Sequence, residues 1–157
     1  AFLTERGYRV APVTVDNSEW IFARAYDEAL DRGDKPLGQR LGDAYQVYME
    51  AMVEYYEGQS LALFEREIPQ VLLLHANALN AHHLAPLLKR LVARGYRFVD
   101  LDTALADPAY ASPDRYIGPG GITWLHRWAL TREVDRSIFS GEPATPEWVQ
   151  EVAGIRE

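Results

Sequence analysis

The stretch Gln70-Val71-Leu72-Leu73-Leu74-His75 predicts the fold class of this chain. Its apolar residues follow one another without alternation and stop at strand length, which is typical of a buried strand in a parallel sheet covered on both faces. Two similar runs, residues 9–15 and 96–101, are separated from it by helical patterns. Short connections between such strands and helices favour right-handed crossovers. We therefore predict an α/β fold with parallel strands, and three strands are few enough to suggest an incomplete sheet.

Helices are predicted between and after these strands. Asp16, with Glu19 three positions later, fits a capping box that opens a helix ending near residue 32. A second helix is predicted over about residues 40–57, because apolar side chains recur there at alternating spacings of four and three. This apolar stripe consists of Leu41, Tyr45, Tyr48, Met52 and Tyr55. Further helices are expected over about residues 79–94, just after Asp102, and over 122–134.

Composition excludes several classes of protein. The chain has 157 residues, 48% hydrophobic residues and a formal net charge of −7, which is typical of one globular domain. Its acidic balance and the lack of a basic stripe argue against general nucleic-acid binding. No apolar run approaches the ~20 residues of a membrane span. With no cysteine, the chain has neither a disulfide scaffold nor a thiol nucleophile.

The leading candidate for chemistry is His75, which ends the central predicted strand. Sites in β/α proteins are built at this end of the strands, and an imidazole exchanges a proton near neutral pH. The alternative is a half-buried histidine satisfied by a backbone carbonyl. Asp16 and Glu19 follow the end of another predicted strand, where a carboxylate could orient the imidazole. Their alternative role is the helix cap, and both roles can hold if one carboxylate caps and the other reaches the site.

Other aromatic and histidine residues carry weaker signals. Trp20 could form a wall for a sugar ring, or could lie in the core. His82 and His83 are adjacent in a predicted helix and point about 100° apart, so they cannot chelate one metal together. His126 is expected to pack. The sequence contains no HxxxH, HExxH or CxxC arrangement, and we predict no metal ligands in this chain.

Two short motifs resemble the last two motifs of the polysaccharide deacetylases, the NodB-homology family. Asp16-x-x-Glu19-Trp20 is similar to the family pattern Asp-x-x-Asp-Trp, and Leu73-x-His75 matches its pattern Leu-x-His. The resemblance implies a distorted β/α barrel that removes N- or O-acetyl groups from a carbohydrate such as peptidoglycan, chitin or xylan. It implies that His75 is the general acid, that Glu19 (or Asp16) orients it, and that Trp20 and Leu73 shape the substrate groove.

The family's remaining motifs are absent. Its divalent metal ion, expected to be zinc, is held by an Asp and two His from earlier motifs, and a separate early Asp is the base. Residues 1–157 are therefore expected to be the C-terminal half of the domain, with a helical insertion at about 40–67 and a helical tail at about 122–157. The start of the chain, which reads as a helix end at Gly7, also looks cut from something larger. Alone the chain should be inactive, and its partners would be the carbohydrate and an upstream half or second chain. The resemblance implies a periplasmic or secreted location.

Two alternatives stay open. The chain could be a non-catalytic binding or interaction module of deacetylase ancestry, in which the helical insertion and the tyrosine stripe dock a partner. The run through His75 also resembles the early strand and helix of an α/β-hydrolase, with Ala76 where that family has Gly. That family requires a G-x-S-x-G nucleophile elbow, and no such pattern follows His75.

Overall fold

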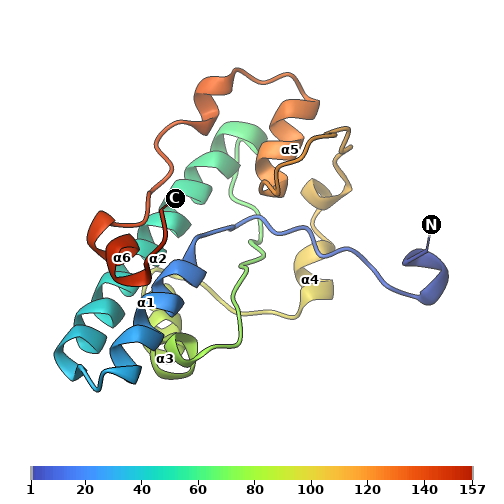
Figure 1. The fold of residues 1–157 in the computed structure, drawn as a ribbon. Coiled ribbons are helices and arrows are strands. Elements are labelled where there is room, and N and C mark those ends of the chain that lie inside the picture. The colour runs from blue at the N-terminus through green and yellow to red at the C-terminus, as the bar shows by residue number, and fades with distance from the viewer. Residues whose placement is uncertain (1, 157) are drawn as a thin grey trace.

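A computed structural model describes residues 2–156, and over this range the chain is helical, without a β-sheet (Figure 1). The predicted α/β fold, a partial β/α barrel with parallel strands, is therefore wrong. The helices are α1 (Glu19–Asp31), α2 (Lys35–Phe64), α3 (Ala78–Ala93), α4 (Leu101–Leu105), α5 (Trp124–Thr131) and α6 (Glu147–Ala153). Three 3₁₀ turns complete the described elements: η1 (Thr4–Arg6), η2 (Pro108–Ala111) and η3 (Arg136–Phe139).

The three predicted strands are long, irregular connections. Residues 9–15 and 70–75 meet in one isolated parallel bridge, between Val15 and Leu72. Few backbone hydrogen bonds support it: the N–H groups of Thr14 and Val15 share the Val71 carbonyl, and Leu73 donates to Val15.

Two features prevent a ladder of pairs. Pro12, within the first segment, and Pro69, immediately before the second, have no N–H to donate, so a donor is missing close to the bridge on each side. The third segment, residues 96–100, pairs with neither of the others, and its one recorded backbone N–H bond runs from Tyr96 back to Leu91 in α3. These three apolar segments thus lack the adjacent segments whose hydrogen bonds would make them strands.

Helix α2 is the central element, and it packs against α1, α3 and α5. Asp34 caps it by accepting a hydrogen bond from the Leu37 N–H at 3.0 Å, and the helix continues seven residues past its predicted end, to Phe64. The chain leaves it at Glu65, whose φ of 58° is left-handed. The predicted apolar stripe is confirmed: Leu41, Tyr45, Tyr48 and Met52 are buried and Tyr55 is half-buried. No helix within residues 2–156 combines the length and the apolar character needed to cross a membrane.

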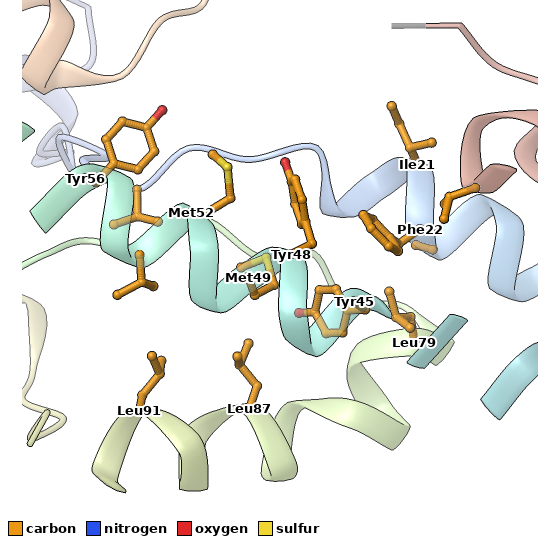
Figure 2. Packing of buried hydrophobic residues seen from close by; sticks show 14 of the residues in the cluster. Ile21, Phe22, Tyr45, Tyr48, Met49, Met52, Tyr56, Leu79, Leu87 and Leu91 are labelled. Carbon is orange, nitrogen blue, oxygen red and sulfur yellow. The ribbon is translucent and has the colours of Figure 1, made fainter. Parts of the chain in front are cut away.

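The core lies between α2 and the helices on its two sides. Tyr48, Met52 and Tyr56 project from one side of α2, while Leu87 and Leu91 of α3 approach it from the other (Figure 2). The core also includes Ile21, Phe22, Tyr45, Met49 and Leu79 (Figure 2). Burial of large side chains at about 25 cal/mol per Å² of apolar surface is the dominant stabilisation of such a bundle. Helix α6 closes the other side of α1.

Candidate functional site

The site is built where the segment before α1 runs beside the segment before α3. The bridge at Val15 and Leu72 sets the two segments in parallel, and the Asn17 side chain donates to the Leu73 carbonyl at 2.8 Å. Glu19 begins α1 just after the first segment, and His75 ends the second. Their side chains meet: His75 Nδ1 lies 2.8 Å from Glu19 Oε2, across 56 residues of sequence. Two sequence-predicted site residues are thus brought together by the fold.

Glu19 is fully buried, with 0% of its surface exposed. Its carboxylate is surrounded by hydrogen-bond donors: Oε2 faces His75, while Oε1 accepts from the side-chain amides of Asn80, at 2.6 Å, and Asn77. A buried ionised carboxylate requires such donors, because water is not there to solvate it. The only ion pair recorded for Glu19 among residues 2–156 is the one with His75.

His75 is open to solvent, in contrast to its partner. Its side chain is 53% exposed. Since an ionised carboxylate only accepts, Nδ1 must carry the proton that it donates to Glu19. The second ring nitrogen, Nε2, has no hydrogen bond recorded within the described residues, and it is the nitrogen that a ligand could reach. A buried carboxylate that fixes one tautomer and an exposed second nitrogen are the arrangement of a general acid or base.

Asp16 has a different place from the one predicted. It is half-buried, and its Oδ1 accepts from the N–H of Asn17 at 3.0 Å. The predicted capping box is wrong: Ser18 is the N-cap of α1, and the N–H of Glu19 donates to the Asn17 side chain at 2.9 Å. Burial raises the pKa of Asp16, partly offset by its hydrogen bond and by attraction to His75. The structure therefore gives His75 a hydrogen-bonded partner in Glu19 and an electrostatic neighbour in Asp16.

Trp20 and Leu73 flank the pair in the chain. Trp20 follows Glu19 in α1, and its side chain is 48% exposed rather than buried in the core. Leu73 precedes His75 by two residues and is also exposed. Both are exposed apolar side chains close in sequence to a member of the pair, and such side chains can contact the apolar face of a ligand.

The other three histidines lie against neighbouring residues, and His82 is exposed at the surface. His82 Nδ1 lies 2.9 Å from the Tyr26 hydroxyl, and the His83 ring lies so close to Gly42 that a Cβ there would be 2.0 Å from its Cε1. His126 is buried among aromatic rings, as expected. Within residues 2–156 no group of three or more His, Cys, Asp or Glu side chains is arranged to hold a metal ion.

Three residues of the site were not predicted. We define the His75 network as His75, Glu19, Asn77, Asn80 and Tyr45, which are joined by hydrogen bonds. Asn77 and Asn80 follow His75 by two and five residues, at the start of α3. The signal that could have found them is two asparagines within the five residues that follow a candidate histidine. Tyr45 was predicted only as a member of the apolar stripe.

Comparison with protein-family models, with curated proteins and with solved structures found no match to this chain.

Proposed function

We propose that this chain supplies the acid-catalysing part of a metal-dependent carbohydrate deacetylase, which hydrolyses N- or O-acetyl groups of a polymer such as peptidoglycan, chitin or xylan. The observation that supports the proposal most is the contact between Glu19 and His75, 2.8 Å between Oε2 and Nδ1. These are the residues of the Asp-x-x-Glu-Trp and Leu-x-His motifs that the deacetylase resemblance pairs as positioning carboxylate and acid.

His75 acts at the departure of the leaving group. When the C–N or C–O bond of the tetrahedral intermediate breaks, its electron pair goes to the sugar nitrogen or oxygen, which takes a proton from His75 Nε2. The ring is left neutral with its proton on Nδ1, where Glu19 already accepts it. The buried carboxylate stabilises the imidazolium before transfer and keeps the ring aimed after it.

A carbohydrate would find exposed apolar side chains near the pair in the sequence. Pyranose rings present an apolar face of C–H groups, and the exposed Trp20 indole offers a flat apolar surface for it. Leu73 would extend this surface on the side of His75.

The metal ion of the proposed reaction does not fit this chain. Residues 2–156 contain no ligand cluster, so we derive no step through a metal here. The ligands and the base would come from another polypeptide segment, an upstream half or a second chain.

An apolar groove provides a surface for that partner. It has a volume of about 340 Å³ and lies between residues 69–72 and 96–101. Phe98 and Val99 are exposed along it, and the N–H groups of residues 97–100 have no recorded backbone partner within the described chain. Exposed apolar surface beside unpaired backbone is typical of a surface that another polypeptide covers.

The test of catalysis is acetate release from acetylated chito-oligosaccharides, peptidoglycan fragments and acetylated xylan. The assay uses this chain together with the polypeptide that carries the metal ligands, with Zn²⁺ added. His75→Ala should lower turnover at least ~100-fold, because general acid catalysis contributes factors of this size. Unimpaired turnover in this variant would contradict the assignment of His75.

Carbohydrate binding is tested on this chain alone by following the indole N–H signals in NMR spectra. Acetylated chito-oligosaccharide should shift the signal of Trp20, and Trp20→Ala should abolish binding. Trp148 is the internal control, because the guanidinium of Arg40 covers its ring, with Cζ 3.9 Å from the ring centroid. The indole N–H signal of Trp148 should not shift. Binding without acetate release in the complete assay would favour the non-catalytic module.

A further inference from the structure

We propose that Asn80, held in one orientation by Tyr45, is a positioning residue that fixes the Glu19 carboxylate against His75. The inference rests on the function proposed for the His75–Glu19 pair and adds the part of the fold that determines its geometry.

Asn80 uses each of its polar groups within the site. It is 6% exposed, and its Nδ2 donates both to Glu19 Oε1, at 2.6 Å, and to the backbone carbonyl of His75, at 2.8 Å. One amide group therefore holds the carboxylate and the backbone of the histidine at the same time. Rotation of the Glu19 carboxylate away from His75 would leave one N–H of this buried amide without its acceptor, which is unfavourable.

Tyr45 supports the orientation of the amide that the acceptors of Glu19 and His75 require. Its hydroxyl donates to Asn80 Oδ1 at 2.7 Å, in the buried region between α2 and α3. Burial raises the pKa of Tyr45, and the negative charge of Glu19 raises it further, so the phenol keeps the proton that it donates. If the amide flipped, its oxygen would face the Glu19 carboxylate and the His75 carbonyl, and these contacts would be repulsive. The Tyr45 hydroxyl would then have to turn its proton away from Asn80 and give up the bond that it now donates.

Asn77 supports the same arrangement from the start of α3. Its Oδ1 accepts from the Asn80 N–H at 2.8 Å as the cap of the helix, and its Nδ2 donates to Glu19 Oε1. Asn80 is distinct because its side chain bonds to three parts of the fold. It contacts α1 through Glu19, α2 through Tyr45, and the segment before α3 through the carbonyl of His75.

The test measures the tautomer of His75 by ¹⁵N NMR in this chain, above the pH at which the imidazole is charged. Wild type should show the proton on Nδ1. Asn80→Ala should produce a population with the proton on Nε2, the tautomer that predominates in free histidine, and Tyr45→Phe should produce a smaller one. A purely structural role for Asn80 would lower stability without moving the tautomer.

The matched control is Tyr96→Phe, which also removes one tyrosine hydroxyl bonded to α2, at Glu57 (2.7 Å). Glu57 lies twelve residues from Tyr45, or about 18 Å along the helix. This variant should keep the wild-type tautomer. If Asn80→Ala does not fold, as judged by its circular dichroism and amide spectrum, Tyr45→Phe decides the question by itself.

The two proposals fail in different ways. An unchanged Nδ1–H tautomer in folded Asn80→Ala, or in Tyr45→Phe where Asn80→Ala does not fold, would overturn the positioning role, whatever the activity of the pair. A changed tautomer with no acetate release in the complete assay would keep the positioning role and overturn the deacetylase function. In an active assay, Asn80→Ala should lower kcat about tenfold with little change in KM.

Discussion

Two histidines of this protein, His75 and His126, differ in their exposure and in the residues that surround the imidazole. His75 lies half in solvent with Nδ1 against a buried carboxylate. His126 is 7% exposed and lies in the His126 cluster, which we define as His126, Tyr55, Tyr56 and Phe139. Burial lowers the pKa of His126 to about 4, so this ring is neutral at physiological pH. The comparison shows that the partner and the access of an imidazole decide whether it is available for chemistry.

The largest expected effect is that of Glu19→Gln on turnover. Asn77 and Asn80 both donate to the position of Oε1, so the new amide must place its oxygen there and its NH₂ group against His75 Nδ1. A proton on Nδ1 then meets another donor, and the imidazolium loses its support. We expect acetate release in the complete assay to fall ~10²- to 10⁴-fold.

The matched control for this variant is in the other cluster. His126→Phe retains an aromatic ring in an aromatic environment and touches no residue of the His75 network, so turnover should stay within about twofold of wild type. Equal losses in the two variants would mean that general destabilisation, and not the chemistry of the pair, lowers the activity.

For the free energy of unfolding we expect the opposite order, with a larger loss from a change at His126 than from one at His75. His126→Ala removes a ring packed against Phe139, with centroids 4.6 Å apart, and leaves a cavity. We expect the free energy of unfolding to fall by about 3 kcal/mol, and His75→Ala to lower it by less than about 1 kcal/mol because that ring is half exposed. Urea unfolding followed by circular dichroism measures both. A larger loss for His75→Ala would show that the His75 network stabilises the fold more than the His126 cluster does.

The pH dependence of stability sharpens the contrast further. The imidazole of His126 takes up a proton near its ordinary value of 6.5 in the unfolded chain but only near 4 in the folded one. The unfolded state therefore binds more protons in this window, and stability falls as the pH drops from about 6.5 toward 4. With allowance for solvent screening, we expect a loss of about 2 kcal/mol.

The contribution of His126 is isolated by subtracting the unfolding free energy of His126→Phe from that of wild type at each pH. His126→Phe should lack it, so the difference in unfolding free energy between wild type and variant should change with pH over that window. The raised pKa of Asp16 is present in both proteins and cancels. A constant difference between pH 7 and pH 4 would contradict the assignment to His126.

The smallest expected effect comes from the hydroxyl that touches His126. Tyr55 Oη lies 3.3 Å from His126 Nε2, a long contact on a half-buried residue. Tyr55→Phe should lower the free energy of unfolding by about 0.5 kcal/mol, measured by the same urea titration. Tyr45→Phe, whose 2.7 Å bond is fully buried, should cost more. Equal losses of unfolding free energy in Tyr55→Phe and Tyr45→Phe would mean that burial and bond length do not distinguish the His126 cluster from the His75 network.

Local patterns predicted much of the helical structure. The four-and-three spacing from Leu41 to Tyr55 located α2, and the ranges predicted for α1 and α3 end within about one residue of the observed helices. These predictions succeeded because a helix forms its hydrogen bonds within its own segment, and an amphipathic stripe carries its own signal. Helix ends were predicted less well, and α2 is longer at both ends because Asp34 caps it and apolar side chains continue to Leu63.

For the site, the two short motifs indicated His75 and Glu19, and the fold decided how they are arranged. Sequence left Asp16 and Glu19 as alternatives; the backbone turn at Asn17 and Ser18 directs Glu19 inward and leaves Asp16 bonded to its neighbour. Asn80 and Tyr45 entered the site only because α2 and α3 pack together there. No local pattern records such a contact, since the residues are 35 positions apart.

The amino-acid sequence by itself determined where the helices form and which of their faces are apolar, because both depend on residues within a few positions of one another. Only the tertiary structure decided that residues 9–15, 70–75 and 96–101 make no sheet. A strand needs a partner for its backbone groups, and in the described chain the first two segments share one bridge and a few hydrogen bonds while the third pairs with neither. The same long-range packing that left them unpaired placed a buried carboxylate against an exposed imidazole.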